Sequence, residues 1–157
     1  FRKVSKPVSS WRFGIAAIIA LLHDLFIVIG AFSVLGHFQG IEVDSLFVTA
    51  LLTVLGFSVH DTIVVFDRIR ENLRLRAGQS LSEIINNSIN QTLVRSINTS
   101  LTVIFVLLAL LLFGGETIHT FVMALFIGII AGTYSSIFIA SPILIVWHNW
   151  EMRKNSR

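Results

Sequence analysis

Two aspartates stand inside apolar stretches of the chain, and each is preceded by a histidine. Asp61 follows His60 in GFSVHDTIVVF, and Asp24 follows His23 in LLHDLFIVIG. A carboxylate in hydrocarbon costs roughly 2.5–3.5 kcal/mol on insertion scales, so each one needs a compensating partner or a function. Acids within membrane spans commonly mark proton or ion paths. Proton transfer is therefore the chemistry that these residues favour.

Asp61 has two interpretations. It either binds and releases protons, or it is a structural carboxylate buried against another helix and satisfied by Arg95 or by a Thr or Asn side chain. Arg95 is itself ambiguous, because an arginine one turn into a span can snorkel to the surface. Asn98 and Thr99 lie on neighbouring faces of the same expected helix. They favour a polar stripe that needs protein or water beside it.

The histidines and Asp24 allow structural as well as chemical roles. Consecutive residues diverge by about 100° around a helix, so His23 and Asp24 cannot both face one site fully. Asp24 therefore either joins a proton relay or makes structural hydrogen bonds. For His60 we favour a helix–helix hydrogen bond. The other histidines are expected near the ends of spans, and their spacing predicts no metal site: His37, His119 and His148.

Composition indicates that most of the chain is surrounded by lipid. Of its 157 residues, 54% are hydrophobic and 13% are charged, whereas soluble domains carry roughly 25% charged residues. Cysteine is absent, so the sequence offers neither disulfides nor thiolate metal sites. It has no P-loop, GxSxG or HExxH motif, which argues against a nucleotide-driven machine or a hydrolase. We expect no enzymatic activity and no cofactor, with protons as the coupling ion.

Four stretches are long enough to cross the roughly 30 Å hydrocarbon core as helices of about 20 residues. The sequence predicts an all-α integral membrane protein with spans at 13–36, 45–67, 93–113 and 118–148. The intervening and flanking segments are 1–12, 37–44, 68–92, 114–117 and 149–157.

The distribution of basic residues predicts the orientation of these spans. All 12 Lys and Arg fall in or beside 1–12, 68–95 and 149–157, and none lies in 37–44 or 114–117. By the positive-inside rule, both ends of the chain and the connection 68–92 are cytoplasmic. The basic charge then reflects topology and contact with a phospholipid membrane rather than nucleic-acid binding.

The connection 68–92 carries signals of ordered structure. Gly78 offers a stop to the helix of the second span, and Ser80 with Glu83 forms a capping-box pattern. Apolar residues then recur at helical spacing in SLSEIINNSINQTLVRS. We therefore expect an amphipathic helix that lies along the cytoplasmic interface before the third span.

Small side chains recur every four residues in the fourth span. Gly128 and Gly132 form GxxxG, and Ser136 and Ala140 continue the series. Such a series lets two helices approach closely. We interpret it as helix packing rather than chemistry.

Five segments carry a family resemblance, in the family's order along the chain. They are LLHDLFIVIG (21–30), HDTIVVFDRIREN (60–72), QTLVRSINTS (91–100), LFGG (112–115) and GTYSSIFIASP (132–142). Together they resemble the membrane part of the SecF family of bacterial protein-export membrane proteins (SecD/SecF, resistance-nodulation-division superfamily). The resemblance covers only the last four of six expected spans. It leaves out a periplasmic domain and two earlier spans.

The resemblance implies a function and a site. It implies an accessory subunit in the bacterial cytoplasmic (inner) membrane that works with SecD. Such a subunit uses the proton-motive force to assist late translocation of a preprotein through SecYEG. Asp61 matches the family's proton-transporting aspartate, and Arg95 matches the arginine that partners it. His60 stands where the family would lead us to expect Asn.

Two alternatives remain open at the level of sequence. One is a proton-coupled exporter of lipids or small hydrophobic molecules from the same superfamily. The other is a non-transporting membrane scaffold, in which buried polar residues only fix helix packing.

Overall fold

The computed structural model describes residues 10–76 and 78–155, and this part of the chain holds helices and no strand. The prediction of an all-α fold is confirmed. Residues 1–9 and 156–157 of the expected flanking segments, and Ala77 of the connection, lie outside the described residues. The elements are α1 (Ser10–Gln39), α2 (Ser45–Leu75), α3 (Leu81–Phe113), α4 (Glu116–Ser135), the π-helical turn η1 (Ser136–Ala140) and α5 (Ser141–Asn155).

Four helical stretches are long and apolar enough to cross a membrane. They are α1 from Trp11, α2, α3, and the run from Glu116 to Trp150 that combines α4, η1 and most of α5. The four predicted spans all lie inside these helices. Large apolar side chains such as Phe26 and Phe105 are exposed on the outside of the bundle, as lipid-facing residues are. The chain is thus part of a multi-pass membrane protein.

The helix ends follow the local sequence signals. The Asp44 side chain accepts a hydrogen bond from the Phe47 N–H at 3.1 Å and caps α2. Ser80 and Glu83 form the reciprocal capping box that starts α3. Gly40 has a φ of +67° just beyond α1, a conformation that glycine adopts without strain.

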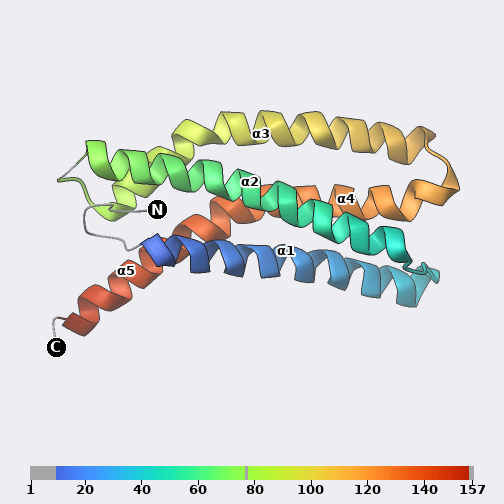
Figure 1. The fold of residues 1–157 in the computed structure, drawn as a ribbon, viewed down its shortest axis with the longest axis horizontal. Coiled ribbons are helices and arrows are strands. Elements are labelled where there is room, and N and C mark those ends of the chain that lie inside the picture. Colours follow the sequence, from blue (N-terminus) through green and yellow to red (C-terminus); the bar gives the residue numbers. More distant parts are fainter. Residues whose placement is uncertain (1–9, 77, 156–157) are drawn as a thin grey trace.

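The amphipathic helix expected in the connection 68–92 forms, but it is not a separate element. α2 runs on to Leu75, and α3 begins at Leu81 and continues without interruption to Phe113. The reason is local, because no Gly or Pro stands between residues 81 and 113 to end the helix. Figure 1 shows the first turns of α3 leaning away from the direction of its remainder.

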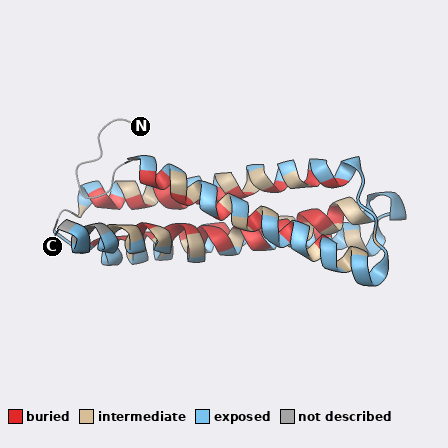
Figure 2. Ribbon diagram, turned by 90° about the horizontal axis from the view of Figure 1, so that it is seen from below, coloured by how far each residue is buried: buried red, intermediate tan, exposed pale blue. Residues whose placement is uncertain are grey.

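The helix α4 is the centre of the bundle. It contacts α1, α2 and α3, and 56% of the residues in the apolar 18-residue stretch of the fourth span are buried, against 17–33% in the other three spans. Figure 2 shows the buried faces of the helices turned toward one another. Two apolar clusters fill the interior, one around Phe13, Ile69 and Leu144 and the other around Val28 and Val54. A layer of buried polar residues separates them.

Glycine lets α4 approach α2 closely. A Cβ atom at Gly128 would overlap the side chain of Val54, and one at Gly132 would lie 3.1 Å from the Cβ of Ser58. Both glycines are buried, as are Ser136 and Ala140, which continue the four-residue series. The small residues of the fourth span therefore lie on its inward face.

We predict that Gly128→Ala destabilises the bundle. The stiff, branched Val54 side chain must move, and overpacking of this kind costs about 1–3 kcal/mol. The measurement is the free energy of unfolding of the full-length protein in mixed micelles. Gly56→Ala is the matched control, because nothing lies within 4 Å of a Cβ at that position. Equal stability of the two variants would contradict the packing argument.

Candidate functional site

Asp61 is buried between three helices and accepts hydrogen bonds from two serine hydroxyls. Asp61 belongs to α2 and is only 7% exposed. Ser96 of α3 donates to Oδ1 at 2.7 Å, and Ser136, the first residue of η1, donates to Oδ2. The Ser136 hydroxyl also lies 3.1 Å from the carbonyl oxygen of Thr133. The carboxylate therefore joins α2 to both α3 and the fourth span.

Asp24 has the same kind of surroundings and is completely buried. Ser58 of α2 donates to its Oδ2 at 2.5 Å, and Ser135 of α4 donates to the same oxygen at 2.8 Å. Nδ1 of His23 lies 3.1 Å from Oδ1. The sequence suggested that neighbouring His and Asp side chains cannot both face one site fully. The imidazole nevertheless reaches the carboxylate.

Arg95 does not lie against Asp61 in this structure. It is exposed on α3, one residue before Ser96, and the helical rotation of about 100° between them turns Ser96 inward and Arg95 outward. Asn98 and Thr99 are exposed as well, and the Thr99 hydroxyl donates to the Arg95 carbonyl at 2.9 Å.

His60 is also exposed, on α2. Within 10–76 and 78–155, no Lys or Arg side chain pairs with Asp24 or Asp61.

The serines that hold the aspartates were missed by sequence reasoning, although α3 carried a signal. Hydroxyl side chains recur there every four residues, and all four are buried: Ser88, Thr92, Ser96 and Ser100. Three of them donate back to carbonyls of their own helix, as hydroxyls in helices commonly do. Ser96 departs from this pattern and donates to Asp61. Ser136 was singled out only as a small packing residue.

A polar hollow of about 290 Å³ opens between α2 and α3. Val64, Thr92 and Arg95 are among the residues that line it. Val64 lies one helical turn from Asp61, and Thr92 lies one turn from Ser96. The hollow therefore ends within about one turn of the buried carboxylate.

Charged and amide side chains surround the outer part of this hollow. Arg68 donates to Glu71 at 2.6 Å and to the side-chain oxygen of Gln91 at 2.7 Å. The buried Asn72 donates to Gln91 and to Ser88. This end of the bundle, at the connection of α2 to α3, holds Arg68 and Arg74 and is called the basic end below.

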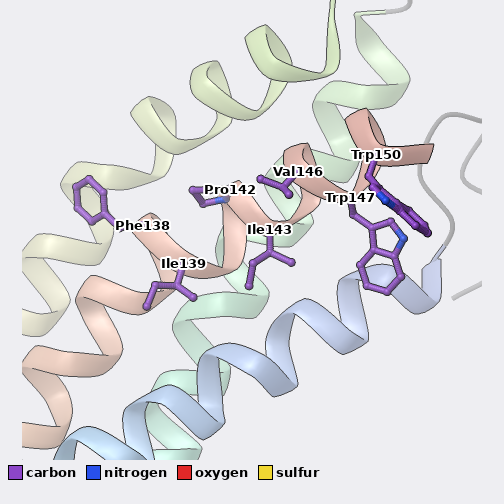
Figure 3. Close-up of a pocket in the computed structure, with 7 residues that line it drawn as sticks. All are labelled: Phe138, Ile139, Pro142, Ile143, Val146, Trp147 and Trp150. Atoms are coloured by element: carbon purple, nitrogen blue, oxygen red, sulfur yellow. The ribbon is translucent and has the colours of Figure 1, made fainter. Parts of the chain in front are cut away.

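A wide apolar hollow elsewhere has different chemistry. It measures about 610 Å³ and runs along η1 and α5 from Phe138 past Pro142 to Trp150 (Figure 3). Its lining residues carry no charged side chain. Within the described part of the chain, no group of three or more His, Asp or Glu could hold a metal ion. The candidate site is therefore the layer around Asp24 and Asp61.

These features define a multi-pass membrane protein with acidic groups buried in mid-span. The family model described as "Protein export membrane protein SecD/SecF, C-terminal" matches residues 9–150. The chain belongs to this SecD/SecF family, and the resemblance found in the sequence is confirmed.

Relatives and solved structures agree with the family. The protein translocase subunit SecF of Thermobaculum terrenum is 65% identical over 149 residues, which cover 95% of this chain and 46% of that protein. The subunit SecDF of Thermus thermophilus is 47% identical over 88% of this chain and 18% of its own. A crystal structure of SecDF in a super-membrane-facing form matches with a TM-score of 0.86 at 44% identity, covering 93% of this chain and 19% of that one. The chain thus spans about half the length of the SecF relatives that it matches.

We predict that Ser96→Ala destabilises the bundle when Asp61 is ionised. A hydrogen bond to a charged group contributes about 1.5–3 kcal/mol, and the alanine leaves the carboxylate with one donor fewer. Urea or SDS titration of the full-length protein at neutral pH gives the change in unfolding free energy. Ser82→Ala on the exposed face of α3 is the control, expected within about 0.5 kcal/mol of the parent. Matching losses in both variants would refute the role of Ser96.

Proposed function

We propose that this chain is the C-terminal membrane part of a protein-translocase subunit that couples proton movement to protein export. The observation that carries the proposal is the setting of Asp61. A carboxylate at 7% exposure is held by two hydroxyls from two other helices, beside a polar hollow that opens toward the basic end. Acids buried within membrane spans commonly mark proton or ion paths.

Protonation of Asp61 would change contacts between helices. The ionised carboxylate accepts from Ser96 and Ser136, whereas a protonated carboxyl group donates one hydrogen bond itself. One serine must then turn its hydroxyl elsewhere. The Thr133 carbonyl, 3.1 Å from the Ser136 hydroxyl, offers such a partner within the fourth span. Proton binding would thereby loosen the link between α2 and η1.

The hollow would be the path that protons take, and the positive charge of Arg95 would influence their passage. Protons would leave Asp61 for the basic end through the hollow that Thr92 and Arg95 line. Arg95 would act from the mouth of this hollow, as a charge that responds to the state of Asp61 rather than as its fixed partner. A positive charge there opposes the entry of protons and favours the ionised carboxylate.

The partners follow from the family. SecD is fused to SecF in the Thermus thermophilus relative, which supports SecD as the partner of this chain. We further propose that the assembly acts on a preprotein at SecYEG in the bacterial inner membrane, with the basic end in the cytoplasm. The structure offers no specific observation for the exporter of small hydrophobic molecules, because none of the residues that line the apolar hollow hydrogen-bonds Asp61.

We predict that Asp61→Asn abolishes the proton-motive-force-dependent part of export. Asparagine keeps the shape of the side chain but has no carboxyl group that can switch between an ionised and a protonated form. The measurement is secretion of a stalled precursor in membrane vesicles that contain the full-length protein with SecD, in the presence and absence of the proton-motive force. Glu42→Gln, at an exposed acid in the loop between α1 and α2 and outside the polar hollow, is the control and retains this component. Undiminished force-dependent export by Asp61→Asn would sink the proposal.

We predict the orientation of the bundle from labelling of single cysteines in a cysteine-free full-length protein. Gln79 lies in the α2–α3 connection and Gln39 at the opposite end, and both are exposed. With the basic end in the cytoplasm, an impermeant maleimide labels Gln39→Cys but not Gln79→Cys in spheroplasts. Inverted vesicles give the reverse. The opposite pattern would overturn the orientation.

A further inference from the structure

The arrangement around Asp61 occurs a second time, one helix earlier in the chain. Each aspartate follows a histidine and accepts a serine hydroxyl from the next helix. That serine lies 34 positions beyond Asp24 and 35 beyond Asp61. Each aspartate also accepts a hydroxyl from the fourth span, and these two donors are the consecutive residues Ser135 and Ser136. The two carboxylates therefore lie at the same level of the bundle, on two sides of one helical turn.

Asp24, like Asp61, has no Lys or Arg partner in the described part of the chain, and its carboxylate is buried still more completely. Asp24 is fully buried, and no Lys or Arg of the described residues pairs with it. Within four residues of Asp24 and of its donors Ser58 and Ser135, the titratable groups are His23 on α1, His60 and Asp61 on α2 and Tyr134 on α4. Of these, His23 makes direct contact with the carboxylate.

His23 gives Asp24 a connection to the outside of the bundle. Its side chain is 32% exposed, whereas that of Asp24 is completely buried. With Tyr134, His23 lines a hollow of about 450 Å³ between α1 and α4. Apart from Tyr134, the other side chains that line this hollow are apolar, so the partly exposed imidazole, and not the hollow, is the group that can carry a proton to and from the buried acid.

From these observations we infer that Asp24 is a second proton-binding site, filled through His23 and coupled to Asp61 through Ser135 and Ser136. The inference rests on the proposed function in one respect, namely that Asp61 carries a proton. In the transfer step, the N–H bond at Nδ1 of protonated His23 breaks and an O–H bond forms at Oδ1 of Asp24. Both groups are then neutral. The Ser135 hydroxyl turns to the Gly132 carbonyl, which already lies 3.2 Å from it.

The two sites influence each other through charge and through one helical turn. Two ionised carboxylates near one another without a cation repel, so a proton bound at one site weakens binding at the other. Ser135 and Ser136 are neighbours in the chain. When one of their hydroxyls stops donating to its aspartate, the helical turn that also positions the other hydroxyl changes.

Infrared spectroscopy of protonated carboxyl groups tests the inference directly. The sample is the full-length protein with SecD in lipid vesicles, titrated from acid to alkaline pH. We expect two titrating carboxyl bands, one lost in Asp61→Asn and the other in Asp24→Asn. Removing the charge of Asp24 weakens proton binding at Asp61 about tenfold, a shift of about one pH unit. Ser135→Ala keeps both carboxyl groups, and it moves both bands, so the coupling is tested even if Asp24→Asn misfolds.

A kinetic measurement tests the route. Hydrogen–deuterium exchange of the Asp24 carboxyl group becomes about tenfold slower or more in His23→Gln. His60→Gln, which removes the exposed histidine beside Asp61, leaves exchange at Asp24 unchanged and is the matched control. Equal rates in the two variants would overturn the role of His23.

The outcomes separate this inference from the proposed function. A band lost in Asp61→Asn, with none assignable to Asp24 at any pH, would overturn the inference and leave the proposed function standing. A response of the Asp24 band to sodium at constant pH would assign the site to a metal cation and would also overturn it. Force-dependent export that survives Asp61→Asn would overturn the proposed function instead.

Discussion

The bundle depends on the hydrogen bonds that Ser135 and Ser136 give to two buried aspartates. A carboxylate in hydrocarbon costs roughly 2.5–3.5 kcal/mol on insertion scales. Two hydrogen bonds to a charged group contribute about 1.5–3 kcal/mol each, which is enough to offset that cost. The donors must therefore come from a helix that passes close to both α1 and α2 at one level. α4 meets this requirement because Gly128 and Gly132 let it pack directly against Val54 and Ser58 of α2.

The π-helical turn keeps the buried face of the fourth span turned toward α1 and α2 beyond the two serines. Buried small and apolar residues recur there every four positions, from Gly128 through Ser136 and Ala140 to Leu144. In a straight α-helix each step of four residues advances by about 40°, so the series would drift off the contact face. In a π-turn four residues complete less than one turn, which reverses part of the drift. Pro142, which lacks an N–H to donate, is the second residue after η1, where the α-helical hydrogen bonding is already interrupted.

Local features of this fold could be predicted from the sequence, and long-range partners could not. The four spans and the capping box depend on hydropathy and on residues a few positions apart. The partner of Asp61 depends on helix rotation. The attraction between opposite charges favoured Arg95, yet its neighbour Ser96 faces the aspartate. The hydroxyls at 88, 92, 96 and 100 marked the correct face of α3, but nothing in the sequence shows that Ser58 and Ser135 converge on Asp24 from two different helices.

A carboxylate held by hydroxyls can change its charge more easily than one held in an ion pair. Serine both donates and accepts, so it can satisfy the ionised and the protonated acid, whereas an arginine would be left as an unpaired cation. Losing charge on the acid weakens each hydroxyl contact from about 1.5–3 kcal/mol to about 0.5–1.5 kcal/mol. One elementary charge moving through 100 mV supplies about 2.3 kcal/mol. A membrane potential of that size would be large enough to change one or two of these contacts. Since Ser96 and Ser136 link α2 to α3 and to η1, such a change alters helix packing rather than one side chain alone.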